Sequence, residues 1–180
     1  LIIINFSMSK LTSGLGIWQI MTSNIITDII SNAGFDLALI DFEHGPNNPN
    51  TLQNIVFTSK SNQLTTIARL PSISYENISQ IIDTGVDGIL YPHIEDITQL
   101  EFVIKKTFLP PIGSRGYSPF TPKYYYSQTK NKESKEPFLG ILIESKKGLN
   151  NLESLLQNSF VDFVYFGAYD LSVEVNKMGN

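Results

Sequence analysis

Short apolar runs of β-forming residues alternate along this chain with longer segments that carry apolar residues at helical spacing. The strand-like runs recur at intervals of roughly 25 residues, and several of them end at a glycine or a proline. This alternation predicts parallel strands joined by crossover helices. The predicted strands are 16–20, 37–43, 65–70, 88–91, 139–143 and 163–166, with a further short strand near Arg115.

The number of strands and the length of the chain together indicate most of one barrel. A (β/α)₈ barrel typically needs about 250 residues, whereas this chain has 180. We therefore predict a TIM-type α/β barrel that is incomplete at its C-terminus and lacks the eighth strand and the closing helix. An open doubly wound sheet is the alternative, but no glycine-rich phosphate loop follows an early strand. We expect residues 1–10 to form an N-terminal extension, 11–180 to form the barrel domain and 117–137 to be a long, partly helical excursion.

Composition excludes several classes of protein. The net charge of −4 gives no sign of a nucleic-acid footprint, so a nucleic-acid surface around Tyr124–Tyr126 is disfavoured. The absence of cysteine excludes disulfides, thiolate zinc sites and cysteine nucleophiles. The apolar run Leu1–Ile4 is far too short to span a membrane, and no basic residue precedes it as in a signal peptide. We therefore expect a soluble, cytoplasmic protein that binds neither nucleic acid nor membrane.

The stretch Leu39–Asn47 has the pattern of a buried strand that ends in ionisable side chains and then breaks. Asp41 and Glu43 fall on one face of this strand because strand side chains alternate with period two. His44 stands where the strand gives way to the turn residues Gly45-Pro46. Catalytic groups of α/β folds occupy this position at the carboxyl end of a parallel strand. The alternative interpretation is a helix-capping acid, a surface acid and a histidine that finishes a turn.

Polar side chains also follow three other predicted strands. Arg69 and Glu144 close the strands 65–70 and 139–143, and Asp170 follows the strand 163–166. Because the carboxyl ends of parallel strands meet at one rim of a barrel, we expect these side chains to be neighbours of Asp41 and His44. The alternative interpretation of each residue taken alone is that Arg69 forms a salt bridge at the surface and that Asp170 caps a helix.

The residue types at this rim suit enolate chemistry on a 2-oxo acid, a small-molecule substrate. Two carboxylates, Glu144 and Asp170, are ligands that Mg²⁺, Mn²⁺ or Co²⁺ would accept together with several waters. A metal held there would chelate the carboxylate and carbonyl of the substrate and act as a Lewis acid. Arg69 would stabilise the oxyanion. His44 is the candidate general base, and Asp41 could orient it.

Two further residues are weaker candidates. His93 follows Pro92 at the end of the fourth strand and could line the same rim, but a histidine there is more often a loop residue. We therefore leave His93 off the catalytic list. Arg115 lies in a Gly-Ser-Arg-Gly turn, and its alternative interpretation is a structural arginine that bridges loops.

Seven segments of the chain match a known family in order and spacing, from about Leu11 to the C-terminus. The segments are Ala33–Asp36, Leu39–Pro46, Ala68–Pro71, Asp83–Ile89, Pro110–Gly116, Ile143–Glu144 and Gly167–Ser172. On these segments the chain resembles the HpcH/HpaI aldolase family, the metal-dependent class II pyruvate aldolases. The acid-x-Glu-His-Gly-Pro and Gly-x-Arg-Gly pieces are each fairly specific, and together they are a strong signature.

The resemblance implies a (β/α)₈ barrel that assembles into homo-oligomers and an enzyme that reversibly cleaves 4-hydroxy-2-oxo acids to pyruvate and an aldehyde. It implies that Glu144 and Asp170 are the metal ligands. It also implies that His44 is the base with Asp41 behind it, and that Arg69 contacts the pyruvyl oxygen. The family includes lyases that act on citryl and malyl thioesters, but the Glu-His-Gly-Pro signature favours the aldolase branch.

The chain departs from the family pattern at three places. Leu142 stands two residues before Glu144, where many members carry a glutamine that contacts substrate, and Ala168 replaces the more usual proline before Asp170. The chain also stops near Gly179-Asn180, before the final strand and helices of the barrel. The alternative function is therefore a truncated, catalytically silent homologue that acts as a structural or partner-binding subunit.

Overall fold

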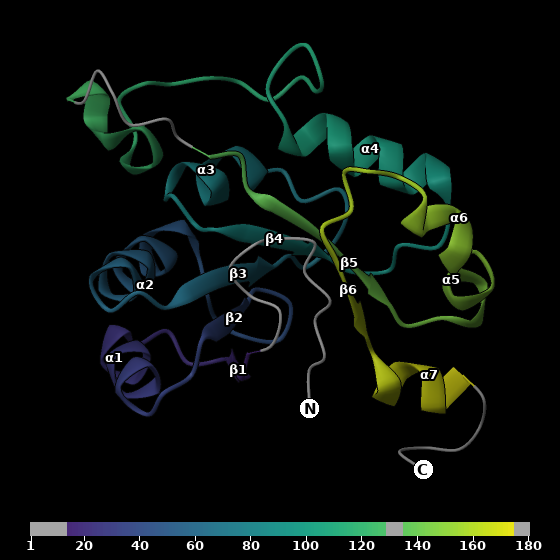
Figure 1. Ribbon diagram of the computed structural model, residues 1–180, viewed down its shortest axis with the longest axis horizontal. Helices are drawn as coiled ribbons and strands as arrows, with labels where there is room; N and C mark the ends of the chain where they lie inside the picture. Colours follow the sequence, from purple (N-terminus) through teal and green to yellow (C-terminus); the bar gives the residue numbers. More distant parts are fainter. Residues whose placement is uncertain (1–13, 129–134, 175–180) are drawn as a thin grey trace.

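Six parallel strands curl into part of a barrel in the computed structural model, which describes residues 14–128 and 135–174 (Figure 1). The strands lie side by side in chain order, and each is hydrogen-bonded to the next. They are β1 (Gly16–Gln19), β2 (Leu37–Asp41), β3 (Thr65–Arg69), β4 (Gly88–Tyr91), β5 (Phe138–Ile143) and β6 (Phe163–Phe166). The predicted incomplete TIM-type barrel is confirmed, with six of its eight strands in the described residues.

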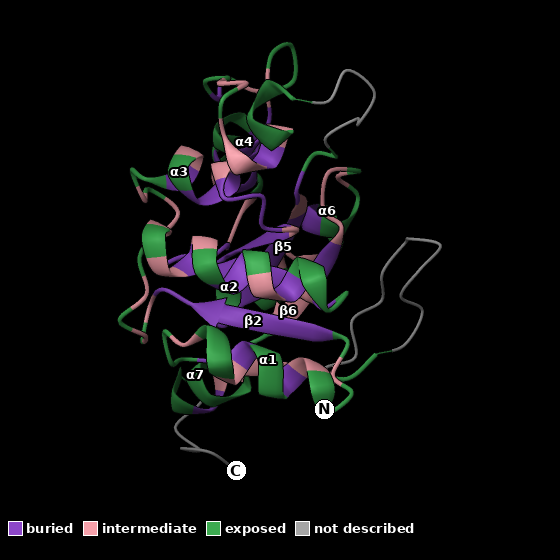
Figure 2. Ribbon diagram, turned by 90° about the vertical axis from the view of Figure 1, so that its left-hand side faces the viewer, coloured by how far each residue is buried: buried purple, intermediate pink, exposed green. Residues whose placement is uncertain are grey.

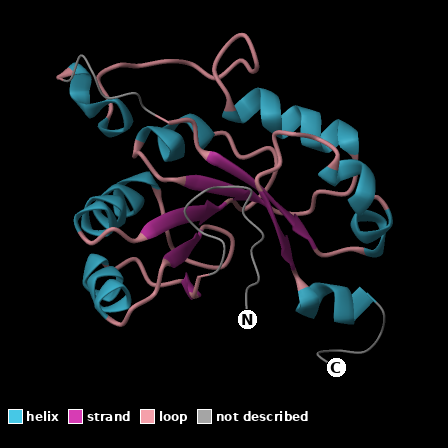
Figure 3. Cartoon of the chain, viewed as in Figure 1, coloured by secondary structure: helices cyan, strands magenta, loops and turns pink. Residues whose placement is uncertain are grey.

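Helices follow the strands and surround the outside of the sheet (Figure 3). None of the helices in the described ranges is long and apolar enough to cross a membrane. The α-helices are α1 (Asn24–Asn32), α2 (Pro49–Ser61), α3 (Ile78–Asp83), α4 (Ile97–Thr107), α5 (Lys146–Asn150), α6 (Leu152–Leu156) and α7 (Ala168–Glu174). The excursion between α4 and β5 contains a 3₁₀ helix, η1 (Pro122–Ser127), which agrees with the predicted partial helicity of this segment.

Four of these helices begin at a polar residue whose side chain accepts a backbone N–H of the first turn. Such caps satisfy backbone donors that have no partner within the helix. They are Ser23 for α1, Asn48 for α2, Asp96 for α4 and Ser145 for α5. The caps fix where each helix starts, and with it the length of the loop that carries the polar residues after each strand.

The period-two alternation of the strands divides the apolar side chains of the sheet between two clusters. The outer cluster, with Ala38, Ile40, Ala68, Ile89 and Ile141 among its members, packs against the helices. In Figure 2, β2 is buried behind the exposed outer faces of α1 and α2. The inner cluster consists of Leu37, Leu39, Ile67, Leu90, Leu142 and Phe163. Because Leu39, Ile67 and Leu142 face inward, the residues two positions later, at the carboxyl end of β2, β3 and β5, face the same side.

An aspartate directly precedes each even-numbered strand and ties it to the strand before. Its Oδ2 accepts a backbone N–H from the start of that earlier strand, and its own N–H donates to a carbonyl there. The Oδ2 contacts are Asp36 with Leu15 at 2.8 Å, Asp87 with Thr66 at 2.8 Å and Asp162 with Leu139 at 2.7 Å. The repeated contact fixes the register at the amino ends of the strands, and so determines which residues reach the opposite rim.

The prediction of a short strand near Arg115 is wrong. Within the described residues β4 pairs directly with β5, and no strand lies between them. The backbone N–H of Ser114 donates to Lys105 O at 2.8 Å, and that of Arg115 donates to Phe108 O at 3.1 Å. These N–H groups satisfy carbonyls at the end of α4, so they are not available to a sheet.

The second predicted strand is shorter than the pattern indicated, since β2 ends at Asp41 and not at residue 43. Asp41 Oδ1 accepts the backbone N–H of Glu43 at 2.9 Å and that of His44 at 3.1 Å. A side chain that bonds the backbone two and three residues ahead turns the chain and competes with strand pairing. The predicted extension at 1–10 lies outside the described residues.

The packing of the inner cluster can be tested at Gly140. This residue pairs with Phe163 of β6, and a Cβ atom added to it would overlap the phenyl ring. Gly140→Ala should therefore lower the free energy of unfolding by about 1–3 kcal/mol, the usual effect of overfilling a packed core. Urea denaturation measures the change.

Gly116→Ala is the matched control, because a Cβ there meets nothing within 4 Å. It should change the free energy of unfolding by less than about 0.5 kcal/mol. The double variant Gly140→Ala, Phe163→Leu should be less destabilised than the sum of its two single variants. A Gly140→Ala protein as stable as the wild type would contradict the described packing.

Candidate active site

A cleft of about 500 Å³ opens at the carboxyl end of the sheet. Its walls come from β1, β2, β3, β5, β6 and the loops that follow them. All five residues selected from the sequence line this cleft, although up to 129 positions separate them along the chain, as the shared rim of parallel strands requires. They are Asp41, His44, Arg69, Glu144 and Asp170.

Asp41 and Arg69 form a two-pronged ion pair on neighbouring strands, where they are register partners. Arg69 Nε donates to Asp41 Oδ1 at 3.0 Å, and Nη2 donates to Oδ2 at 2.9 Å. The Arg69 guanidinium also lies 4.7 Å from the centre of the Trp18 ring, within the range of a cation–π interaction. Its third nitrogen, Nη1, lies 2.9 Å from Glu43 Oε2. The guanidinium is thus held on three sides.

The pKa of Asp41 lies below its ordinary value. Burial raises it, but the hydrogen bonds from Arg69 and from the backbone N–H groups of His44 and Glu43 outweigh that effect. The carboxylate therefore stays ionised at neutral pH and matches the charge of Arg69. The expected contact between Asp41 and the imidazole of His44 is not formed in the described residues. Both carboxylate oxygens are already engaged, so Asp41 reaches His44 through its backbone N–H.

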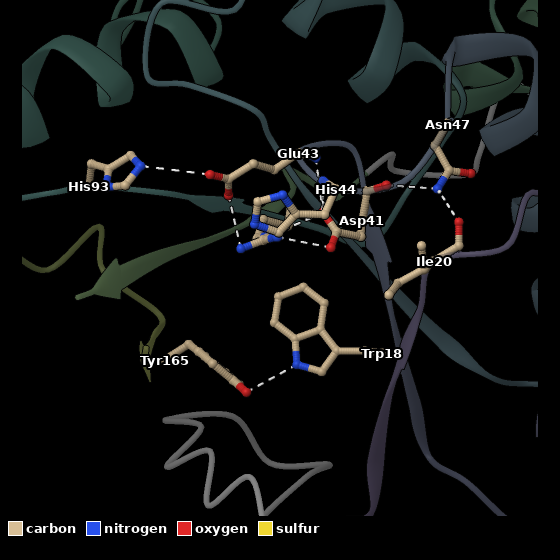
Figure 4. A network of polar contacts seen from close by, with 9 residues as sticks. Trp18, Ile20, Asp41, Glu43, His44, Asn47, His93 and Tyr165 are labelled. Atoms are coloured by element: carbon tan, nitrogen blue, oxygen red, sulfur yellow. Dashed lines mark hydrogen bonds and ion pairs between the residues drawn. The ribbon is translucent and has the colours of Figure 1, made fainter. Parts of the chain in front are cut away.

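Glu144 is buried at the end of β5 and is bound by His93, which follows β4. Glu144 Oε1 accepts the backbone N–H of His93 at 2.8 Å and lies 2.7 Å from Nδ1 of the same histidine. Nε2 of His93 lies 3.7 Å from Glu43 Oε1, and Figure 4 shows the two side chains pointing toward each other. A continuous polar network therefore links Arg69 to Glu144 through Glu43 and His93.

The pKa of Glu144 lies above its ordinary value. Burial raises the pKa of Glu144, contacts with His93 lower it, and the negative charges of Glu43 and Asp170 raise it again. Gly167 allows the start of α7, which carries Asp170, to lie close by, since a Cβ at Gly167 would lie 2.7 Å from Glu144 Cβ and 3.3 Å from Oε2. Carboxylates brought together in this way repel each other unless a cation lies between them.

The donor set fits a hard divalent ion. Mg²⁺ and the similar Mn²⁺ are bound through one or two carboxylates and keep several waters. Within residues 14–128 and 135–174, no group of three or more His, Cys, Asp or Glu side chains could hold a metal by itself. Glu144 and Asp170 therefore suit an ion that completes its coordination with water or substrate.

The floor of the cleft is apolar and is crossed by one hydrogen bond. Trp18 Nε1 on β1 donates to Tyr165 Oη on β6 at 3.0 Å, and the two rings meet edge to face (Figure 4). This contact joins the first and last strands of the described sheet across the cleft. Leu142 also lines the cleft and is a buried member of the inner cluster.

Four residues of this site were given no role from the sequence, although two of them, Glu43 and His93, were considered at their strand ends; the four are Trp18, Glu43, His93 and Tyr165. A signal existed for two of them, because Glu43 stands two residues after Asp41 and His93 follows a strand end. For Trp18 and Tyr165 the sequence indicated only that each lies in a strand. Arg115 lies near the opposite end of the sheet, where its Nε donates to Thr107 O at 2.8 Å, so its structural interpretation fits.

Two known proteins of similar sequence are named as aldolases. The chain is 31% identical to a hydroxypyruvate/pyruvate aldolase of Roseobacter denitrificans, over 96% of this chain and 69% of that protein. It is 29% identical to a 5-keto-4-deoxy-D-glucarate aldolase of Klebsiella pneumoniae, over 92% of this chain and 66% of that protein. The chain thus spans about two thirds of the length of these relatives.

A solved structure shows the same fold. The crystal structure of an HpcH/HpaI aldolase from Desulfitobacterium hafniense superposes on 93% of this chain and 67% of its own, with a TM-score of 0.81 and 22% identity. The model of the family described as HpcH/HpaI aldolase/citrate lyase matches residues 15–180, which include every residue of the cleft. The sequence, the fold and the site agree, and the chain belongs to the HpcH/HpaI aldolase/citrate lyase family.

Proposed function

We propose that this protein is a divalent-metal pyruvate aldolase, a carbon–carbon lyase that reversibly cleaves 4-hydroxy-2-oxo acids to pyruvate and an aldehyde. The observation that carries the proposal is the single cleft in which Arg69, His44 and the carboxylates Glu144 and Asp170 meet. The named activities of the similar Roseobacter and Klebsiella proteins support the same class of reaction.

Glu144 and Asp170 are the proposed ligands of the ion, which would be Mg²⁺, Mn²⁺ or Co²⁺. When bound, such an ion supplies Lewis acidity to the carbonyl and carboxylate of a 2-oxo acid. Arg69 adds a fixed positive charge beside the carbonyl oxygen of the proposed substrate. Asp41 takes two of its five N–H groups and Glu43 faces Nη1, so N–H groups remain for a substrate oxygen.

His44 is the proposed general base. It lies at the exposed rim of the cleft, just after the turn that Asp41 stabilises. In the cleavage direction it takes the proton of the 4-hydroxyl group as the bond between C3 and C4 breaks. The electron pair of that bond passes to pyruvate as its enolate, whose oxygen Arg69 stabilises, and C3 then takes up a proton. The remaining fragment leaves as the aldehyde.

A catalytically silent homologue is the second candidate. One observation favours it: β1 and β6 are the two edges of the described sheet and do not pair with each other, so the cleft lies at a gap in the barrel. In this case the rim would hold its charged residues without turning over a substrate. Metal binding and pyruvate release separate the two candidates.

Two further expectations stay predictions. The chain is proposed to assemble into homo-oligomers, which fits the exposed apolar side chains Ile25 and Ile29 on α1 and Val173 on α7. It is also expected to act in the cytoplasm on a small-molecule substrate.

Pyruvate release from a panel of 4-hydroxy-2-oxo acids with added Mn²⁺ tests the aldolase activity. His44→Ala should slow the reaction by about 10²–10⁴-fold, because it removes the group that accepts the hydroxyl proton. Wild-type protein treated with a chelator should be similarly inactive. Equal rates in the two proteins, independent of metal, would end the aldolase proposal.

Arg69→Lys tests the role of the guanidinium. A lysine keeps the charge but not the two-pronged geometry, so kcat should fall by about 10²–10³-fold while Mn²⁺ binding stays unchanged. The other arginine of the chain provides the control. Arg115→Lys should lower the melting temperature and leave kcat per folded molecule as in the wild type, since Arg115 lies outside the cleft. An Arg69→Lys protein with full activity would refute the assignment.

Thermal melting with and without Mn²⁺ tests the cation site. An ion at 100 times its dissociation constant stabilises the folded state by about 2.7 kcal/mol, which should raise the melting temperature by several degrees. Glu144→Gln and Asp170→Asn should abolish the rise, whereas Asp28→Asn on the outside of α1 should keep it. A melting temperature of the wild-type protein that does not change with added Mn²⁺ would favour the silent homologue.

A further inference from the structure

One oxygen of Glu144 is held entirely by one residue that lies outside the strands. Both the backbone N–H and ring Nδ1 of His93 approach Oε1, at 2.8 and 2.7 Å. His93 has a φ of +54°, in the left-handed region that few residues other than glycine adopt. In this conformation a single residue presents its backbone donor and its ring to the same oxygen.

The two partners differ strongly in exposure. The side chain of His93 is 63% exposed, while that of Glu144 is 4% exposed. The contact therefore contributes little to the apolar core, and the ring lies over the carboxylate from the solvent side. The other ring nitrogen, Nε2, lies 3.7 Å from Glu43 Oε1, so the ring stands between the carboxylates of Glu144 and Glu43.

Charge repulsion and rotamer freedom both act against a single conformation of Glu144. The negative charges of Glu43 and Asp170 act on it, and a glutamate side chain has several rotamers of similar energy. With Oε1 bound to His93, Oε2 lies beside Gly167, the residue that precedes α7, the helix that carries Asp170. The anchored conformation is thus the one that leaves an oxygen on the side of the second proposed ligand.

We propose that His93 is a positioning residue that selects the conformation of Glu144 in which Oε2 is presented to a divalent cation. This inference rests on the proposed function, because it assumes that Glu144 is a metal ligand. It goes beyond it by assigning a role to a residue that touches neither the substrate nor the ion. Groups that hold a ligand carboxylate in place typically change metal affinity by about 10–100-fold when they are removed.

The test measures the dissociation constant for Mn²⁺ directly, from the electron paramagnetic resonance signal of free Mn²⁺, with no substrate present. His93→Gly removes the ring and fits the left-handed backbone, so it should weaken Mn²⁺ binding by about 10-fold or more. His93→Asn keeps a short side-chain donor and a residue tolerant of this backbone, so its affinity should lie between those of His93→Gly and the wild type.

Gln63→Gly is the matched control, because Gln63 is an exposed residue with a φ of +60° that does not line the cleft. It should bind Mn²⁺ as the wild type does. Circular dichroism verifies that each variant is folded, and His93→Asn provides the comparison if the glycine variant is unstable.

Wild-type affinity in both His93 variants would overturn the inference and leave the aldolase proposal intact. An equal loss in Gln63→Gly would also overturn it, since the loss would then come from the backbone change. A wild-type protein that binds no Mn²⁺ would overturn the inference together with the metal site. Absence of pyruvate release, with the affinity ranking as expected, would refute only the aldolase activity.

Discussion

The in-register pair of Asp41 and Arg69 is the contact on which the organisation of the cleft depends. Both side chains are buried, and a buried charge that loses its partner is strongly destabilising, so each requires the other. The pair forms because β2 and β3 are hydrogen-bonded neighbours whose register places Asp41 opposite Arg69. Asp41 also ends β2 through its hydrogen bonds to the next backbone N–H groups. One carboxylate thereby orients the guanidinium and places His44 at the mouth of the cleft.

Much of this arrangement follows from sequence patterns. The strands and their chain order were predictable because apolar runs and helical spacing are local properties, and the helix caps Asn48 and Asp96 carry their own chemical signal. The meeting of Asp41, Arg69 and Glu144 was predictable because parallel strands place their carboxyl ends at one rim. The absence of a strand near Arg115 was not predictable from the sequence. The backbone N–H groups there are bound by carbonyls at the end of α4, and this contact depends on how the loop folds back.

The partners of the charged residues could not be predicted for a related reason. Strand register and side-chain rotamers determine which acid binds Arg69 and which histidine binds Glu144. Neither can be deduced from the order of the residues. His93 is the clearest case, because its role depends on a left-handed backbone that histidine adopts only where the surroundings favour it. Trp18 and Tyr165 were missed because an aromatic residue on a strand has the same pattern whether it fills a core or lines a cleft.

The charge of the cleft itself argues for a cation beyond Arg69. Asp41, Glu144 and Asp170 line it, and the guanidinium, the one lysine or arginine group among the lining residues, is already paired with Asp41 and Glu43. A 2-oxo acid is an anion, and a cleft with this excess of carboxylates would repel it. Burial raises the pKa of Glu144, and the negative charges of Glu43 and Asp170 raise it further. The proposed cation between Glu144 and Asp170 would therefore supply the positive charge that the proposed anionic substrate requires at this acidic rim.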